Sequence, residues 1–337
     1  MNIKQLAKTL ELSISTVSRA LNGYADVNAQ TRLRVQEAAA TFGYQADAGA
    51  RRLVRGSTDA IGMVYASSVD SLGNPQFADM THGLSKCLES SRMDLLLAVA
   101  EDDHEVHIYD RLFKGGRVDA VVVPNTRVQD KRITYLQSKG HPFVAYGRTQ
   151  SPADYSWVDF DNDHCSELAV EHLWALGHRS FAYVHADLEL NYAFERHRGF
   201  QGAMAAAGLQ CPPSQVVGDV IDRRSGTQAV KQLLALPHLP TAIVVDNNLA
   251  GVGVLQGLMD AGLKVGHDVS VVVHGDIPVD FLNAGLQVTT VQQPTPQETG
   301  VDLAALVLKV LSKPQEGPYQ ILKKSALVVG ATSGPVR

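Results

Sequence analysis

The sequence predicts an α/β protein in which a small all-α head precedes two lobes built on doubly wound parallel sheets. Residues 1–21 carry apolar side chains at the spacing of two short helices. From residue 60 onward, nearly continuous apolar runs alternate with amphipathic stretches, which is typical of parallel strands covered by helices on both faces. The runs form two series, which predict two lobes: residues 61–65, 95–100, 120–124 and 143–147, and then 181–185, 242–246 and 269–273.

The head is predicted to contain a helix-turn-helix. Its first helix places four apolar side chains on one face, namely Ile3, Leu6, Ala7 and Leu10. Ser13 can cap a second helix over residues 16–21. The inward positions of that helix are Val17, Ala20 and Leu21. Two short helices joined by a tight turn form a DNA-reading unit, with the second helix in the major groove.

The outward side chains of the second helix suit contacts with DNA. They are Ile14, Ser15, Thr16, Ser18 and Arg19. An apolar side chain can contact a thymine methyl group, hydroxyls can bind phosphates or bases, and a guanidinium can bind guanine. We expect Arg19, Ser15 and Ile14 to specify the DNA sequence. Thr16, Ser18 and Asn22 are expected mainly to hold phosphates.

Charge along the chain supports a DNA-binding head. Residues 1–56 contain eight basic and four acidic side chains, a net charge of +4, whereas the remainder contains 22 basic and 31 acidic side chains, a net charge of −9. A third helix is expected from the cap Asn28 to about residue 41, with its apolar positions at Leu33, Val35, Ala38 and Ala39. A basic head on an acidic body localises phosphate attraction to one end of the molecule.

Other chemistry finds little support in the sequence. Three cysteines without a CxxC pair predict neither disulfides nor a zinc site. Residues 104–107 (HEVH) lack zinc-helix spacing and are interpreted as a solvent-exposed helix start, so no metal or cofactor is expected. No hydrolase or phosphate-loop motif occurs, and no catalytic residues are assigned. The chain shows neither a signal-peptide pattern nor an apolar run of about 18 residues, so we expect a cytoplasmic protein without a membrane partner.

Several segments closely resemble the lactose-repressor (LacI/GalR) family of transcriptional regulators. They are ISTVSRALNG (14–23), VNAQTRLRVQEAA (27–39), FGY (42–44), ARRL (50–53), NPQFADMTHGL (74–84), LAVEHLWALGHR (168–179), DVSVVVHGDIP (268–278) and TTVQQP (289–294). The resemblance covers essentially all 337 residues in the family's order. It implies a homodimeric repressor that binds a pseudo-palindromic operator and is controlled by a small molecule held between two periplasmic-binding-protein-like lobes.

The resemblance also implies a division of the chain. The helix-turn-helix would occupy residues 1–45 and a hinge helix residues 46–57, with Arg51 on DNA and Leu53 wedged into the minor groove. A plain linker is the alternative for this hinge. The first lobe would comprise residues 58–158 and 290–318, and the second lobe residues 159–289 and 319–337.

Effector-binding residues follow from the same resemblance. The expected set is Phe77, Asn125, Tyr146, Arg148, Arg196, Asn247 and Asp276. A guanidinium such as that of Arg196 can donate paired hydrogen bonds to sugar hydroxyls or to a carboxylate. An exposed helix charge is the alternative for Arg196, helix capping for Asn247, and core packing for Phe77.

The identity of the effector is inferred from two glycines of the expected site. Gly147 and Gly275 stand where relatives carry acidic residues, which predicts a roomier pocket and favours a mono- or disaccharide, such as an α-glucoside. A purine or another metabolite is the second choice. A sugar-binding module without DNA function and an enzyme on the same scaffold are the remaining alternatives.

Overall fold

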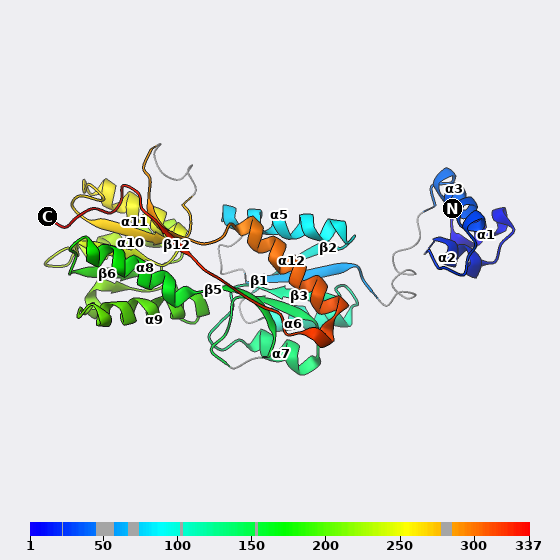
Figure 1. The fold of residues 1–337 in the computed structure, drawn as a ribbon, viewed down its shortest axis with the longest axis horizontal. Helices are drawn as coiled ribbons and strands as arrows, with labels where there is room; N and C mark the ends of the chain where they lie inside the picture. The colour runs from blue at the N-terminus through cyan, green and yellow to red at the C-terminus, as the bar shows by residue number, and fades with distance from the viewer. Residues whose placement is uncertain (22, 45–56, 67–73, 102–103, 152–153, 278–284) are drawn as a thin grey trace. The chain divides into compact units, whose positions relative to one another are not determined.

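The computed structural model describes residues 1–21, 23–44, 57–66, 74–101, 104–151, 154–277 and 285–337. The chain divides into two compact units, Met1–Thr58 and Asp59–Arg337, called here the helical unit and the two-lobed unit (Figure 1). Three residues expected to contact DNA, Asn22, Arg51 and Leu53, lie outside the described residues, as does nearly all of the expected hinge.

The helical unit contains the predicted helix-turn-helix. Its helices are α1 (Ile3–Leu10), α2 (Ile14–Leu21) and α3 (Ala29–Thr41). The Thr16 amide donates to Ser13 Oγ at 3.0 Å and the Thr31 amide to Asn28 Oδ1 at 2.7 Å, so both expected caps form. The buried core of this unit comprises Leu6, Ala7, Leu10, Val17, Ala20, Val27, Val35 and Ala39. Local spacing and capping therefore determine this unit.

Leu33 corrects the expected face of the third helix. Its side chain is 56% exposed, whereas Val35 and Ala39 are buried. Residues two apart in a helix lie about 200° apart around its axis, so Leu33 and Val35 cannot both face the core.

The first lobe of the two-lobed unit is built on a six-stranded parallel sheet of order β11-β5-β4-β3-β1-β2. Its strands are β1 (Ala60–Ala66), β2 (Asp94–Ala100), β3 (Ala120–Val123), β4 (Phe143–Tyr146), β5 (Ser156–Phe160) and β11 (Gln320–Lys323). Its helices are α5 (Pro75–Ser90), α6 (Glu105–Lys114), α7 (Lys131–Lys139) and α12 (Pro296–Ser312). Buried apolar clusters lie on both faces of the sheet.

The second lobe repeats this plan in the order β12-β10-β9-β8-β6-β7, with β12 antiparallel to β10. Its strands are β6 (Phe181–Val184), β7 (Val216–Val217), β8 (Ala242–Val245), β9 (Ser270–His274), β10 (Thr289–Gln292) and β12 (Ala326–Val328). Its helices are α8 (Asn162–Ala175), α9 (Asn191–Ala206), α10 (Arg223–Leu234) and α11 (Asn248–Asp260). Apolar clusters again cover both faces.

Strand pairing corrects two of the expected lobe boundaries. We expected the chain to return to the first lobe at residue 290, but β10 pairs with β9 and belongs to the second sheet. We expected residues 319–337 in the second lobe, but β11 pairs with β5 in the first sheet. The chain crosses between the lobes after β5, after β10 and between β11 and β12, the last crossing being drawn in red in Figure 1. Short strands carry no local signal of the sheet they join, which explains the difference.

Candidate DNA-binding surface and interlobe site

The α2 helix presents a polar surface around one exposed apolar residue. Ile14 is 45% exposed at its first turn. The hydroxyl oxygens of Ser15 and Thr16 lie 2.8 and 2.7 Å from Ser13 Oγ, and Ser18 is half-buried farther along the helix. These residues thus offer an apolar tip and hydroxyl groups on one element, which is the chemistry needed for thymine and phosphate contacts.

Arg19 is held by its neighbours on this surface. Its Nε donates to Asp26 Oδ1 at 3.3 Å, and its Nη2 forms an ion pair with the same carboxylate. The guanidinium carbon lies 5.3 Å from the centre of the Tyr24 ring. Both members of the ion pair have half-exposed side chains, so Arg19 remains accessible to a ligand.

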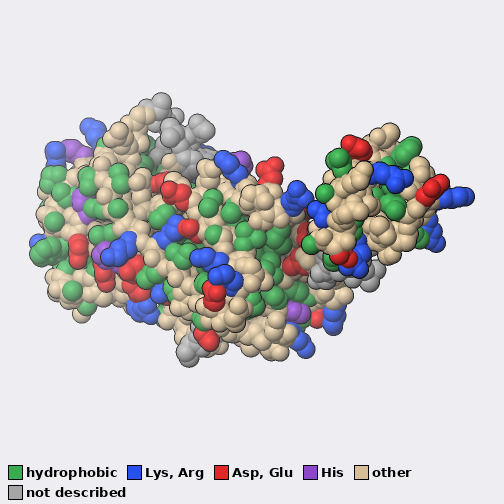
Figure 2. Space-filling model, turned by 45° about the vertical axis from the view of Figure 1, so that its right-hand side comes forward, with side chains coloured by type: hydrophobic (Ala, Val, Ile, Leu, Met, Phe, Trp, Pro, Cys, Tyr) green, Lys and Arg blue, Asp and Glu red, His purple; other side chains and the backbone are tan. Residues whose placement is uncertain are grey.

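In the two-lobed unit, the expected effector residues gather near the carboxyl ends of strands from both sheets. Arg148 follows β4, Asn125 follows β3, and Asp276 follows β9. Arg196 belongs to α9 of the second lobe. This edge is where ligands bind in open α/β sheets. On the face of the two-lobed unit visible in Figure 2, acidic and basic side chains are intermixed.

Arg196 lies at the centre of this group. Its side chain is buried, and its Nε donates to Asn162 Oδ1 at 3.0 Å. Its Nη1 donates to the main-chain oxygen of Asp246, and its guanidinium carbon lies 4.9 Å from the Tyr192 ring centre. Among the described residues these bonds use Nε and Nη1, which leaves Nη2 to bind a ligand. Burial excludes the alternative of an exposed helix charge.

Buried ionisable groups surround Arg196. Burial raises the pKa of Asp246, an effect that Arg196 opposes. Burial, and secondarily the charge of Arg196, lower the pKa of His274 well below its ordinary value. His274 therefore stays neutral at neutral pH, and Arg196 supplies the positive charge at this point.

A charged link joins the two lobes. Arg148 of the first lobe donates through Nε to Asp159 Oδ2 at 2.7 Å and through Nη2 to Glu195 Oε2 of the second lobe at 3.1 Å. Gln150 Nε2 donates to Glu195 Oε1 at 3.1 Å. Burial raises the pKa of Glu195, with the charge of Asp159 as the next cause, and burial also raises the pKa of Asp159.

Main-chain bonds reinforce this interlobe link. The Asn191 amide donates to Thr126 O, and the Val128 amide donates to Glu189 O, both at 2.8 Å. Asn125 begins this loop with a φ of 48°, and its main-chain oxygen accepts from Arg132 Nη2 at 2.8 Å. Asn125 therefore shapes the loop that contacts the second lobe.

Asn247 behaves as a helix cap. Its Oδ1 accepts from the Ala250 amide at 2.9 Å at the start of α11. Its Nδ2 donates to Val220 O and to Asp246 Oδ1, both at 2.8 Å. Because both amide hydrogens are used, the contacts of Asn247 match the capping alternative.

The remaining expected effector residues, Phe77, Tyr146 and Asp276, make different kinds of contact. Phe77 packs edge-on against Tyr65 with ring centres 4.6 Å apart, in agreement with core packing. Tyr146 lies edge-on to Phe160, and burial raises the pKa of its hydroxyl to about 12. Asp276 is half-buried, and its Oδ1 accepts no hydrogen bond from the described residues.

Gly147 does not enlarge the site as expected. A Cβ built there would lie 2.2 Å from Thr126 Oγ1, and the backbone φ is 110°. Thr126 therefore fills the space that a side chain at this position would occupy. At Gly275, with φ of 81°, the nearest atoms to such a Cβ are 3.7 and 3.8 Å away, on Asn248 and Gln76.

Sequence reasoning missed the acidic half of the interlobe group. Asp159 and Glu195 were not proposed, although Glu195 directly precedes Arg196 in the chain. Glu105 was likewise expected in solvent, but it is 2% exposed and accepts from Arg132 Nη1 at 2.9 Å. Burial of acidic side chains depends on contacts between distant segments, which a single sequence does not display.

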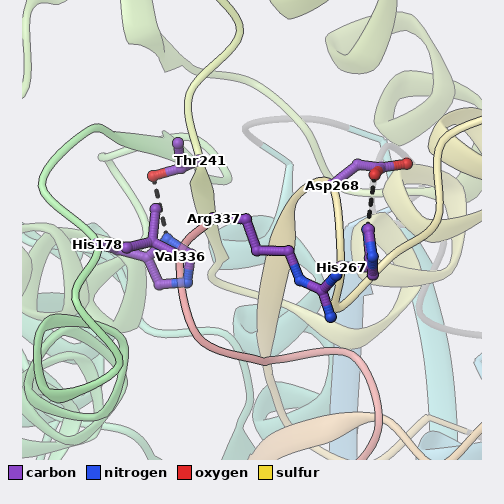
Figure 3. A pocket seen from close by; sticks show the side chains of 6 residues that line it. All are labelled: His178, Thr241, His267, Asp268, Val336 and Arg337. Atoms are coloured by element: carbon purple, nitrogen blue, oxygen red, sulfur yellow. Dashed lines mark hydrogen bonds and ion pairs between the residues drawn. The ribbon is translucent and has the colours of Figure 1, made fainter.

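A separate hollow of about 260 Å³ lies at the amino ends of the second lobe's strands (Figure 3). His178 and Thr241, which precede β6 and β8, are bonded to each other at 3.0 Å, and His267 is bonded to Asp268 at 2.8 Å. This hollow is therefore at the opposite edge of the sheet from Arg196, and none of the expected effector residues lines it. No grouping of three or more potential metal-binding side chains occurs among the described residues.

Comparison with known proteins defines the family. Residues 2–47 match the bacterial regulatory proteins of the lacI family, and residues 58–328 match the periplasmic binding proteins and sugar binding domain of the LacI family. The chain belongs to the LacI family of transcriptional regulators, which bind DNA and are not enzymes. The HTH-type transcriptional regulator RafR of Escherichia coli is 37% identical over 334 residues, covering 98% of each chain. AglR of Rhizobium meliloti is 32% identical, covering 99% of this chain and 95% of the relative.

Solved structures share this fold over 83–99% of the chain. The lac repressor dimer bound to operator and the anti-inducer ONPF has a TM-score of 0.85 at 22% identity, covering 99% of each chain. The complex of the regulator CelR with cellobiose has a TM-score of 0.74 at 24% identity, covering 98% of this chain and 99% of the other. A transcriptional regulator of Yersinia pestis has a TM-score of 0.76 at 34% identity, covering 83% of this chain and 99% of the other. Within the described residues, no helix is both long and apolar enough to span a membrane.

Proposed function

We propose that this regulator is a homodimeric repressor whose affinity for a pseudo-palindromic operator is set by a mono- or disaccharide bound between its lobes. The observation that carries the proposal is the buried group around Arg196, which lies where the carboxyl ends of both sheets meet. A ligand that bridges both lobes stabilises their closed arrangement relative to the open one. The effector site and the DNA-binding surface are thereby coupled as a linked equilibrium. Because a repressor acts on its operator inside the cell, we assign the protein to the cytoplasm.

On the DNA side, α2 enters the major groove. Arg19 reads guanine, Ser15 and Ile14 add sequence preference, and Thr16 and Ser18 hold phosphates. The exposed Ile14 and the accessible guanidinium of Arg19 support these roles. Within the segments that the structure does not describe, we assign phosphate binding to Asn22, DNA contact to Arg51 and minor-groove insertion to Leu53.

On the effector side, the chemistry favours hydroxyl groups. Arg148 is paired with the carboxyl groups of Asp159 and Glu195, and the Asp246 carboxyl interacts with Arg196, so little net positive charge remains for an anionic ligand. Arg196 Nη2 offers donors and Asp276 Oδ1 an acceptor, a mixture that suits a polyol. Tyr146 and Phe77 border the site, while Asn247 and Asn125 fix α11 and the interlobe loop. The structure of CelR with cellobiose supports a sugar.

Dimerisation is supported by an exposed edge strand. Strand β2 ends the first sheet, and its Leu97 and Val99 are 46% and 53% exposed. Monomeric proteins usually protect apolar edge strands, so this edge is a suitable interface for a second copy. The fold likeness to the lac repressor dimer supports the same assembly.

A thermal-shift screen tests the effector assignment. Neutral disaccharides and monosaccharides, sugar phosphates and purines are offered separately to the full-length protein. A ligand bound by the native state alone raises the melting temperature, with about 2.7 kcal/mol of stabilisation at a hundredfold excess over Kd. We expect a neutral sugar to stabilise the protein, and Arg196→Ala to abolish that shift.

Arg198 provides the matched control. It lies two residues from Arg196 on α9 but is half-exposed and bonded to Asp163 at 2.7 Å. Arg198→Ala should therefore keep the sugar-induced shift. A shift that survives Arg196→Ala would place the ligand elsewhere, and a response to purines alone would replace the sugar by the second candidate.

A further inference from the structure

The loop that follows α2, residues 24–27, is rigidly attached to the core of the helical unit. Val27 is buried in that core. Arg32 of α3 donates through Nη2 to Tyr24 O at 2.8 Å and to Val27 O at 3.1 Å, so one guanidinium ties the two ends of the loop together. The Tyr24 amide also donates to Arg19 O at 3.1 Å, which joins the loop to the end of α2. Side chains of this loop therefore hold a defined position relative to α2.

Two side chains of this loop constrain the guanidinium of Arg19. The Asp26 carboxylate accepts from Nε at 3.3 Å and pairs with Nη2, so it lies along one edge of the guanidinium. The Tyr24 ring, 5.3 Å from the guanidinium carbon, lies against the group as a cation–π partner. A long arginine side chain otherwise samples many rotamers, and immobilising one on binding DNA costs conformational entropy.

The bonds to Asp26 leave the guanine-reading donors of Arg19 available. A guanidinium has five N–H donors in a planar fork, and a carboxylate on the Nε edge uses the Nε hydrogen and one Nη2 hydrogen. The other Nη2 hydrogen and a Nη1 hydrogen remain on the adjacent edge, parallel to each other. Two parallel donors match the O6 and N7 acceptors of guanine in the major groove.

We propose that Asp26 is a positioning residue for operator recognition, which with Tyr24 holds Arg19 in the orientation that reads guanine. This inference rests on the proposed role of Arg19. The negative charge of Asp26 also repels phosphates, but it weakens binding to operator and non-operator DNA alike and so leaves their affinity ratio unchanged. Asp26 thus raises the ratio of operator affinity to non-specific affinity by orienting Arg19.

The test measures that ratio with full-length protein. An operator duplex is first selected from a random pool with the wild-type protein, and Kd values for it and for a scrambled duplex are measured at one fixed salt concentration. We expect Arg19→Ala to lower the ratio by about tenfold or more, as expected for one bidentate base contact. Asp26→Asn should lower it by about tenfold, because the lost charge tightens binding to both duplexes equally whereas only the operator loses the oriented guanine contact.

A charge-matched control and a double variant isolate the positioning role. Glu37 is an exposed acid on α3, and Glu37→Gln changes the net charge as Asp26→Asn does. It should tighten binding to both duplexes equally and keep the ratio. In an Arg19→Ala background, Asp26→Asn should lower the ratio no further, because the guanidinium that it orients is absent.

A modified base reports the contact itself. Replacing each guanine of the selected operator in turn by 7-deazaguanine removes the N7 acceptor and should weaken wild-type binding at one position in each half-site. Asp26→Asn should reduce that penalty. Tyr24→Leu, which removes the ring and keeps the carboxylate, should reduce it as well and serves as the second variant if Asp26→Asn destabilises the helical unit.

Two results would overturn the inference, and they differ in what else they affect. If Arg19→Ala lowers the ratio but Asp26→Asn and Tyr24→Leu behave like Glu37→Gln, Asp26 does not position Arg19 and the proposed function stands. If Arg19→Ala itself keeps the ratio, the role of Arg19 in the proposed function fails together with this inference.

Discussion

Glu11 ends α1 with a backbone φ of 55°, in the left-handed region that favours glycine. Its amide still bonds to the Ala7 and Lys8 oxygens, so the cap itself is formed. A non-glycine residue in this conformation destabilises the folded state by about 1–2 kcal/mol. A glycine would remove that strain, but its greater freedom in the unfolded chain would offset about 0.5–1 kcal/mol of the gain. The helical unit therefore carries a strained residue at the turn of its DNA-reading motif.

Glu11→Gly should raise the free energy of unfolding of the helical unit by about 1 kcal/mol, because it removes this strain. Chemical denaturation followed by circular dichroism at 222 nm measures the change. Glu11→Ala is the control, since it removes the same charge but keeps a Cβ in the left-handed conformation, and it should gain little. Equal stabilisation by both variants would attribute the effect to charge instead of backbone strain.

His274 makes the two-lobed unit sensitive to acid. Its ring is buried, its Nε2 lies 3.4 Å from Ser166 Oγ, and burial followed by the charge of Arg196 holds its pKa well below 6.5. The folded state therefore binds this proton less readily than the unfolded state does. The stability that a neutral His274 contributes is complete above pH 6.5 and is lost as the pH falls from 6.5 toward the folded pKa.

Below pH 6.5, we expect this group to cost the folded state about 1.4 kcal/mol per pH unit. His274→Gln should lower the slope of unfolding free energy against pH by about that amount, because glutamine binds no proton. Urea titrations between pH 5 and 7.5 measure both slopes. Parallel curves for the two proteins would show that His274 is protonated in the folded state as readily as in the unfolded state.

Among the elements, the interlobe loop and α9 are linked by Arg148 and Glu195. The Glu195 carboxyl group accepts hydrogen bonds from Arg148 and Gln150 of the first lobe, whereas its own helix, α9, belongs to the second lobe. Next to this pair, the Asn191 amide bonds to Thr126 O across the lobes. The charged pair therefore stabilises the arrangement in which this main-chain bond is made.

Glu195→Gln should favour separation of the lobes, because it removes the charge that attracts Arg148 while keeping a side chain of similar size. The Asn191 amide should then exchange with deuterium about tenfold faster, which corresponds to about 1.4 kcal/mol. Amide exchange followed by mass spectrometry or NMR measures this. Unchanged exchange at Asn191, with Leu173 of the α8 core as the reference, would contradict a latch role for the pair.

Local pattern predicted the elements better than their pairing. Ser13 and Asn28 cap their helices as expected, because a cap bonds to an amide three residues away. The apolar runs also become strands as expected. The sheet that contains β10 or β11 could not be inferred, because that choice depends on a partner strand far along the chain.

In the candidate site too, local sequence indicated some residues, whereas contacts between distant segments determined the rest. Arg196 was predicted from its segment, and the structure buries it at the interlobe group, while its contact with an effector stays a prediction. Glu195 and Asp159 were missed, since their burial is compensated by Arg148, which lies 11 residues from Asp159 and, for Glu195, comes from the other lobe. The space beside Gly147 was misjudged because Thr126 fills it from a neighbouring strand end. Contacts between distant residues decide each of these points.

At the scale of the whole molecule, charge and fold separate two tasks. Residues 1–56 carry a net charge of +4 and the remainder −9, which directs phosphate attraction to the helical unit. The two-lobed unit contains the buried polar group that suits a sugar. We expect these two activities to be coupled, so that occupation of one site changes the affinity of the other.

Operator affinity with and without the sugar tests this coupling most directly. Fluorescence anisotropy with the selected operator gives Kd for the full-length protein, alone and with a saturating concentration of the sugar that raises its melting temperature. We predict a change in Kd of about 5- to 150-fold for the wild type and none for Arg196→Ala. An unchanged Kd for wild-type protein that binds the sugar would show that the two sites are not coupled.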